Sequence, residues 1–172
     1  MKKQKGFSLI ELLIVVAIIL IIAAIAIPNL LRSKIAANES SAVGSIRTIV
    51  TSQVTYSSSW GTGYATALGV LGGTPAVCAV GAAAANACLI DPILSAGAKS
   101  GYNFATNATL PQAIGAVTVN NGFEVEGDPV ARGTTGQRSF CADQTGVIRF
   151  DPKNMLIGVA CNTLPATAVL GN

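Results

Sequence analysis

The sequence predicts an α+β fold in which one long N-terminal helix packs on a small antiparallel β-sheet of about four strands. Three observations predict it: an apolar run at residues 7–27, a helical period of apolar residues over 29–58, and strand-like segments separated by turn signals after residue 100. A helix of roughly 50 residues is far longer than the helices of ordinary globular domains, so a role beyond internal packing is expected.

The composition is that of an ordered, apolar chain. Of its 172 residues, 51% are hydrophobic and 11% are charged, which argues against intrinsic disorder. This length leaves room for one domain and an appendage. The formal net charge is +3, and Lys2, Lys3 and Lys5 are three of the eleven basic residues. The remainder of the chain is neutral, so no nucleic-acid partner is predicted for the isolated chain.

The side chains offer little for catalysis or for metal binding. The sequence contains no histidine, which removes the commonest general base and the commonest metal ligand. It also lacks a phosphate-binding loop, a dinucleotide glycine fingerprint and a paired Cys-x-x-Cys motif. We therefore expect no enzyme activity, no catalytic residue, no cofactor and no metal site. Asp128, Asp143 and Asp151 match no calcium-loop spacing, so turn and cap roles are favoured for them.

Residues 7–27 have the length and composition of a membrane-spanning helix. At 1.5 Å per residue they extend about 31 Å, which matches the hydrocarbon core of a bilayer. Three lysines precede the run and the next basic residue is Arg32, so the short N-terminus is expected in the cytoplasm and the body across the membrane. The run suits a retained signal anchor, or a secretory signal cleaved near Ala24–Ala26.

One carboxylate interrupts this apolar run. Glu11 is the only ionisable side chain within residues 7–27. A charge at the centre of a membrane helix costs about 2.5–3.5 kcal/mol on insertion scales, and such residues are usually functional. The alternative is a carboxylate that snorkels toward the membrane edge.

The stretch KGFSLIELLIVVAIILIIAAIAIPNLL resembles the N-terminus of type IV pilins and of the pseudopilins of type II secretion. In that family a short basic leader ends in glycine, phenylalanine follows, and the fifth residue of the mature chain is glutamate. Gly6, Phe7 and Glu11 occupy those positions, and Pro28 stands where the family kinks its helix. The resemblance covers about the first 30 residues.

The resemblance implies a processing step and an assembly step. A prepilin peptidase would cut between Gly6 and Phe7 and methylate the new amino group of Phe7. Glu11 would neutralise the amino terminus of an adjacent subunit and set the axial stagger of a filament. The implied fold is pilin-like, with a spine helix packed on the sheet.

The implied function is that of a structural subunit polymerising into a type IV pilus for adhesion, motility or DNA uptake. A pseudopilin of a type II secretion system is the alternative, and a signal-anchored periplasmic binding domain is a second alternative from another class. The expected partners are copies of the chain, prepilin peptidase, the inner-membrane assembly machinery and inner-membrane lipid. The precursor would cross the inner membrane once, and the product would be a surface pilus or a periplasmic pseudopilus.

The expected organisation has five parts. They are a cleaved leader at 1–6, the membrane or filament-core half of the spine helix at 7–28, its amphipathic half at 29–60, an αβ loop at 61–100, and the sheet with a C-terminal disulfide region at 101–172. Apolar residues of the amphipathic half recur at helical spacing and predict one face buried on the sheet. They are Leu31, Ile35, Val43, Ile46, Val50 and Val54.

The four cysteines all lie beyond the apolar run, on the expected exported side, where disulfides persist. Three pairings are possible, and we favour the sequence-local one, Cys78–Cys88 with Cys141–Cys161. Crossed pairings and four free buried thiols remain open alternatives.

The strands are expected in the last third of the chain. A hairpin is predicted around Asn121–Gly122, and a type I turn at residues 151–154. The strand candidates are GYNFAT, two segments within AVTVNNGFEVEGDP, QRSFCAD, GVIRFD and MLIGVAC. The ending also resembles a pattern common among pilin-like proteins, seen here as Phe140, Asp143, Gly146, Ile148 and Arg149.

Overall fold

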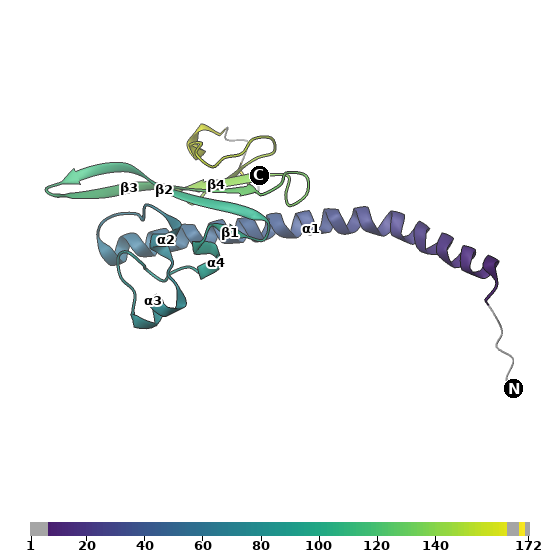
Figure 1. Ribbon diagram of the computed structural model, residues 1–172. Coiled ribbons are helices and arrows are strands. Elements are labelled where there is room, and N and C mark those ends of the chain that lie inside the picture. Colours follow the sequence, from purple (N-terminus) through teal and green to yellow (C-terminus); the bar gives the residue numbers. More distant parts are fainter. Residues whose placement is uncertain (1–6, 165–168, 171–172) are drawn as a thin grey trace. The chain divides into compact units, whose positions relative to one another are not determined.

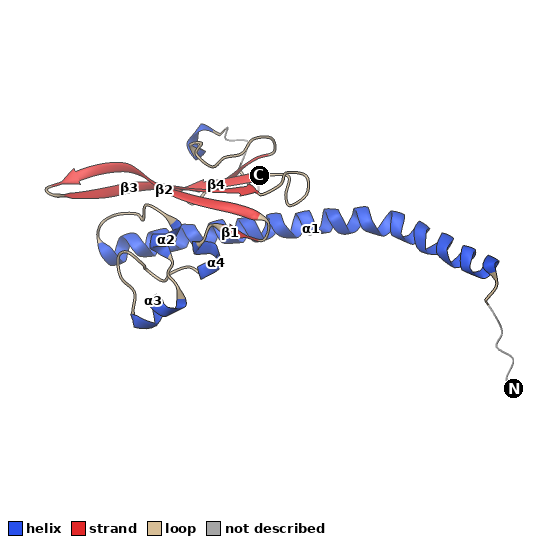
Figure 2. Cartoon of the chain, in the orientation of Figure 1, coloured by secondary structure: helices blue, strands red, loops and turns tan. Residues whose placement is uncertain are grey.

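The computed structural model describes residues 7–164 and 169–170 and divides the chain into two compact units, Met1–Lys34 and Ile35–Asn172. Helix α1 (Leu9–Trp60) runs from the first unit into the second, and every strand belongs to the second (Figures 1 and 2). The remaining elements are α2 (Leu68–Leu71), α3 (Pro75–Val80), α4 (Pro92–Ser95), β1 (Ala98–Lys99), β2 (Tyr102–Ile114), β3 (Val117–Pro129), β4 (Ser139–Asp143), β5 (Ile148–Asp151) and a 3₁₀ turn, η1 (Cys161–Thr163).

The predicted long helix is confirmed. Helix α1 continues through Pro28, which lies inside it, and ends at Trp60, before Gly61 adopts a positive φ of 67°. Its apolar part is long and apolar enough to cross a membrane. Proline lacks an amide hydrogen, so one backbone bond of the helix is missing at Pro28 without ending it.

The predicted α+β fold with an antiparallel sheet is also confirmed, but the sheet has five strands rather than about four. Their order is β1-β2-β3-β4-β5, and all neighbouring pairs are antiparallel. The additional strand is β1, which has two residues and pairs with the start of β2. A strand this short has no period for a sequence pattern to reveal, since it fits between Gly97 and the turn at Ser100–Gly101.

The hairpin predicted at Asn121–Gly122 is wrong. Strand β3 runs straight through these residues, and the turn lies earlier, where Ile114 pairs with Val117 and Gly115 has a φ of +63°. Gly122 serves a different need. A Cβ there would come within 2.4 Å of Oγ1 of Thr109 on the paired strand, so the glycine permits close approach of the two strands.

The strand predicted over Met155–Cys161 is also wrong. This segment is irregular and ends in η1. Its backbone N–H groups donate to carboxylates on β3 instead of to a neighbouring strand. Side-chain carboxylates therefore replace the backbone carbonyls of a neighbouring strand as acceptors for the segment MLIGVAC.

Within the second unit, α1 packs on one face of the sheet, and the segment after β5 lies on the other face (Figure 1). The helix-side core includes Ile46 and Ile49 of α1 and the aromatic rings of Phe104, Phe123 and Phe140 from three neighbouring strands. Alternate residues of β3 and β4 point to opposite faces of the sheet. Each of these strands therefore contributes side chains both to the core under α1 and to the contact with the segment after β5.

The predicted buried face of α1 is only partly right. Ile46 is buried and Ile35, Val43 and Val50 are partly buried, whereas Leu31 and Val54 are exposed. The observed buried face contains small and polar residues that a hydrophobic count passes over: Glu39, Ala42, Ser45, Ile46, Ile49, Ser52, Gln53 and Tyr56. Small side chains let the helix approach the sheet closely, and Glu39 and Gln53 find hydrogen-bond partners outside the helix.

Glu39 ties α1 to the loop between β3 and β4. Its carboxylate accepts the backbone N–H groups of Gln137 and Arg138, and Nε and Nη2 of Arg138 at 2.9 and 2.8 Å. Burial alone would raise the pKa of Glu39, but these hydrogen bonds and the positive charge of Arg138 outweigh burial and lower it. The ion pair thus contributes stability at neutral pH that is lost as the pH falls below the ordinary carboxyl range.

Gln53 is the fully buried polar centre of the helix–sheet contact. Its Nε2 donates to the carbonyl of Ala65 and to Oγ1 of Thr106, both at 3.0 Å, and its Oε1 accepts the Ala65 N–H at 2.8 Å. One side chain therefore joins α1, the following loop and β2.

Replacing Gln53 by leucine is expected to lower the free energy of unfolding by about 2–4 kcal/mol, because buried polar groups left unpaired cost about 1–3 kcal/mol each. Urea unfolding of the detergent-solubilised chain measures the change. Thr51→Ala, an exposed site on the same helix, is the matched control and should change stability by less than about 0.5 kcal/mol. Wild-type stability of the Gln53→Leu variant would contradict this role.

Candidate functional site

The first candidate site is the start of α1. Ser8 immediately precedes the helix, and its backbone N–H donates to Oε2 of Glu11 at 2.9 Å. The N–H of Leu12 donates in turn to the Ser8 carbonyl at 3.2 Å. A glutamate at the third helical position reaching back to the N-cap amide is one half of a capping box. Glu11 therefore stabilises the first turn of its own helix.

Sequence reasoning missed this cap although the signal was present. The order Ser8-Leu9-Ile10-Glu11 has the S-x-x-E spacing of a capping box before an apolar run.

The structure brings together some of the predicted site residues and separates others. Phe7 stands two residues before α1 and Glu11 lies in the first turn of that helix, whereas Pro28 is about 26 Å from Glu11 along the helix axis at 1.5 Å per residue. Gly6 and the rest of the predicted leader lie outside the described residues. The predicted cleavage point lies between Gly6 and Phe7, the first residue that the structure describes.

The position of Glu11 also suits a cationic partner. A carboxylate in the first turn interacts favourably with the positive end of the helix dipole. The Ser8 amide uses one lone pair of Oε2, so further lone pairs can accept from an ammonium group. A chain that began at Phe7 would place its ammonium one residue before Ser8, within the same short segment.

The surface of α1 between Glu11 and Pro28 is apolar. Large hydrophobic side chains from Phe7 to Leu31 are exposed, with Phe7 at 79% and Ile25 at 64% of full exposure. Leaving such area in water costs about 25 cal/mol per Å², so this helix needs lipid or other helices around it.

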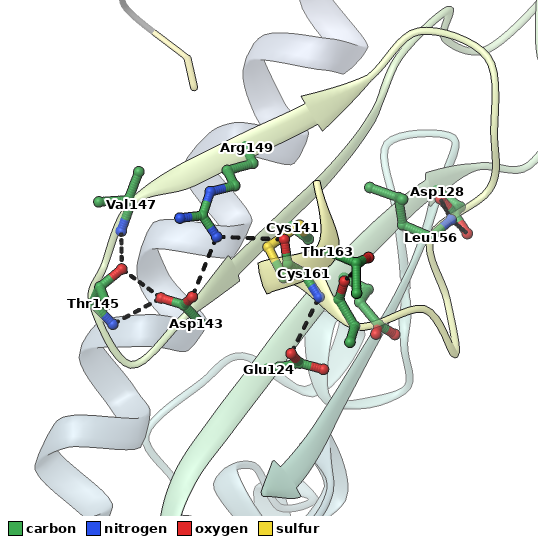
Figure 3. The surroundings of a disulfide bond; sticks show 12 residues. Glu124, Asp128, Cys141, Asp143, Thr145, Val147, Arg149, Leu156, Cys161 and Thr163 are labelled. Atoms are coloured by element: carbon green, nitrogen blue, oxygen red, sulfur yellow. Dashed lines mark hydrogen bonds and ion pairs between the residues drawn. A yellow bond between two sulfur atoms is a disulfide. The ribbon is translucent and has the colours of Figure 1, made fainter. Parts of the chain in front are cut away.

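A second candidate region lies on the outer face of the sheet, around the disulfide between Cys141 of β4 and Cys161 of η1 (Figure 3). Both cysteines are fully buried. The N–H of Cys161 donates to Oε1 of Glu124 at 3.1 Å, and Nη1 of Arg149 contacts the Cys161 carbonyl at 3.4 Å. The disulfide and these hydrogen bonds attach the end of the chain to the sheet.

The other disulfide joins Cys78 of α3 to Cys88 in the loop after it, with 5.7 Å between Cα atoms. The structure thus contains the sequence-local pairing. Gly73 lies against this bridge, because a Cβ at that position would be 2.7 Å from Sγ of Cys78.

The three aspartates considered for calcium each accept backbone N–H groups. Asp128 accepts those of Leu156 and Ile157, Asp143 that of Thr145, and Asp151 those of the turn residues that follow it. Within residues 7–164 and 169–170, no group of three or more His, Cys, Asp and Glu side chains is arranged to hold a metal ion.

Comparisons with known proteins point to the same N-terminal segment. Residues 1–27 match the family model described as the prokaryotic N-terminal methylation motif. The chain is 62% identical over 39 residues, 23% of its length, to the type IV wide pilus major component PilA4 of Thermus thermophilus. It is 44% identical over 54 residues, 31% of its length, to the type IV major pilin protein PilA of Myxococcus xanthus.

These matches are short. They cover 30% and 24% of the two relatives' own lengths. No solved structure matches the chain significantly. The resemblance drawn from Gly6, Phe7 and Glu11 is nonetheless confirmed: the chain begins with a prokaryotic N-terminal methylation motif and is similar, over part of its length, to the subunits of type IV pili.

Proposed function

We propose that the chain is a structural subunit that is cut between Gly6 and Phe7, N-methylated at Phe7, and polymerised through α1 into a type IV pilus. One observation carries this proposal. A methylation motif at residues 1–27 coincides with the start of a helix whose apolar side chains are exposed and whose first turn holds Glu11. The role is structural rather than enzymatic.

Before assembly, the apolar half of the helix, residues 7–28, sits in the inner membrane with the N-terminus in the cytoplasm. Assembly moves it from lipid into a bundle of identical helices. This transfer exchanges lipid contacts for protein contacts, so close packing and polar pairing, rather than removal from water, must provide the specificity. Repeating a head-to-tail contact that does not close gives a fibre.

Glu11 provides the polar pairing. Cleavage after Gly6 creates an ammonium group at Phe7, and in a low-dielectric helix bundle both that cation and the Glu11 carboxylate are costly unless paired. Glu11 keeps its bond to Ser8 and accepts the ammonium of a neighbouring copy. The pairing also fixes how far one helix is displaced along the next.

The second unit has surfaces suited to contact between copies. No charged residue occurs between Arg47 and Asp91, or between Lys99 and Glu124. These stretches carry exposed apolar side chains, including Val80 in α3 and Ile114 in β2. Uncharged surfaces of this kind can pack together without desolvating charges. The other partners are prepilin peptidase, the inner-membrane assembly machinery and membrane lipid.

The names of the two relatives favour a pilus over the alternatives, because both are type IV pilus components. A type II secretion pseudopilus would use the same processing and the same helix bundle. A signal-anchored periplasmic binding domain would use neither.

Electron microscopy of sheared cell-surface material tests the proposal. Immunogold labelling for this chain is expected on long surface fibres, and the fibres are expected to disappear when its gene is deleted. A deletion that leaves fibres unchanged but blocks protein secretion would overturn the pilus assignment in favour of the pseudopilus.

A further inference from the structure

Three carboxylates line the face of β3 that points away from α1. Glu124, Glu126 and Asp128 alternate with Phe123 and Val125 of the helix-side core, so all three lie on the outer face of the strand. Glu126 and Asp128 are each only 1% exposed. Neighbouring members of this row are about 7 Å apart along the strand, from a rise of about 3.4 Å per residue.

Backbone amides of one irregular segment, residues 155–161, meet these carboxylates in antiparallel order. Oδ1 and Oδ2 of Asp128 accept the N–H of Leu156 at 2.8 and 2.9 Å, and Oδ2 also accepts that of Ile157 at 2.9 Å. Glu126 accepts the N–H of Gly158 at 3.0 Å. Glu124 accepts the N–H of Cys161 at 3.1 Å, at the disulfide end of the segment (Figure 3).

Few cations face this row. On β4, Cys141 is paired in the disulfide and Asp143 stands opposite Glu124, adding negative charge. On β5, Arg149 lies 3.5 Å from Asp143. The β2 residues opposite the row are uncharged, and segment 155–161 contains no ionisable side chain.

The other nearby cation, Arg132, donates to the carbonyls of Gln137, Pro152 and Asn154. In the described part of the chain, none of the three row carboxylates makes an ion pair.

The middle carboxylate therefore ionises at a cost. Burial raises the pKa of Glu126 to about 7, with the negative charges of Glu124 and Asp128 adding to the rise and the Gly158 N–H opposing it. If segment 155–161 were released, water would reach Glu126 and its pKa would fall toward the ordinary value of 4.5. The attached state thus binds a proton more tightly than the released state.

We propose that Glu124, Glu126 and Asp128 form a proton-dependent latch for segment 155–161, in which the protonated Glu126 holds the segment on the sheet and deprotonation of Glu126 between its two neighbouring carboxylates loosens it. A neutral Glu126 still offers a carbonyl oxygen to Gly158 but no longer repels its neighbours. The contribution of Glu126 to attachment is full below pH 4.5, where this carboxyl is protonated in both states. The contribution is lost as the pH rises through about 7, because Glu126 then ionises in the attached state as well.

The latch controls an apolar surface. Within the segment, the side chain of Leu156 is buried, whereas those of Met155, Ile157 and Val159 are exposed. The disulfide at Cys161 fixes one end, so loosening is confined to the stretch between β5 and that cysteine. The pH thereby decides how well ordered these outward apolar side chains are. This inference does not depend on filament formation.

The amide resonance of Gly158 in the ¹⁵N-labelled full-length chain, held in detergent micelles, tests the latch. Its chemical shift is expected to titrate between pH 5 and 8.5 with a midpoint near 7. Hydrogen-exchange protection of Leu156 to Gly158, corrected for intrinsic exchange, is expected to fall about tenfold or more over that range, as a pKa shift of one unit corresponds to tenfold.

Two variants make the test specific. Glu126→Gln keeps an acceptor for Gly158 but cannot ionise, so both the titration and the pH-dependent protection should vanish. Asp151→Asn, in an exposed turn, should leave the midpoint unchanged. A Gly158 shift that is flat in the wild type, or that titrates identically in Glu126→Gln, would overturn the latch. The wild-type titration decides the matter even if Glu126→Gln does not fold.

Discussion

Replacing Glu11 by alanine is expected to abolish filament assembly while the chain is still cut between Gly6 and Phe7. The substitution leaves the Phe7 ammonium of a neighbouring copy without its partner in an apolar bundle. Removing one member of a buried ion pair costs about 3–5 kcal/mol, a factor of more than a hundred in each subunit contact. The amount of sheared filament per cell and the N-terminal residue of the membrane-bound chain are the two measurements.

The structure adds a control that separates the two roles of Glu11. Glutamine can still accept the Ser8 N–H, since a capping box works with either residue, but it carries no charge. If charge pairing drives assembly, Glu11→Gln is expected to fail as fully as Glu11→Ala. If Glu11→Gln forms normal filaments and only Glu11→Ala fails, Glu11 acts only as a helix cap. That result would contradict the charge pairing.

Removing the Cys141–Cys161 disulfide by a double alanine substitution is expected to lower the free energy of unfolding of the second unit by about 3–5 kcal/mol. The bridge closes a loop with a sequence separation of 20 residues, and its loss frees the unfolded chain. Both cysteines are also fully buried against Leu156, so truncation leaves a cavity. Urea unfolding under non-reducing conditions measures the effect.

The other disulfide is the matched control. Cys78 and Cys88 are only partly buried, with a sequence separation of 10 residues, and their removal is expected to cost about 2–3 kcal/mol. Equal or greater destabilisation from removing Cys78–Cys88 would contradict the importance assigned to the outer face of the sheet.

The features most accessible from sequence were those with a long period or a fixed spacing. The spine helix follows from an apolar run joined to a helical pattern, and its end follows from Gly61. The motif at Gly6, Phe7 and Glu11 needs only the order of residues along the chain. These signals are local, so no knowledge of packing is required to find them.

The errors arose where tertiary contacts overrode local preference. Asn121–Gly122 is a favourable turn pair, yet β3 passes through it and pairs with β2 there, with Gly122 lying close against Thr109. The segment after β5 reads as a strand, but carboxylates from β3 take its amides.

The polar part of the buried face of α1 was missed for a related reason. It includes Gln53, whose burial is favourable only because a distant loop and strand satisfy its polar atoms. Such partners are set by the assembled fold and cannot be read from spacing.

Intact mass and N-terminal peptide mapping of the chain from its native membrane test the central claim most directly. We expect a chain that lacks Met1–Gly6 and begins at Phe7 with one methyl group on its amino nitrogen. A chain that retains Met1–Gly6, or that begins after Ala26, would contradict prepilin processing and with it the role of Glu11 in assembly.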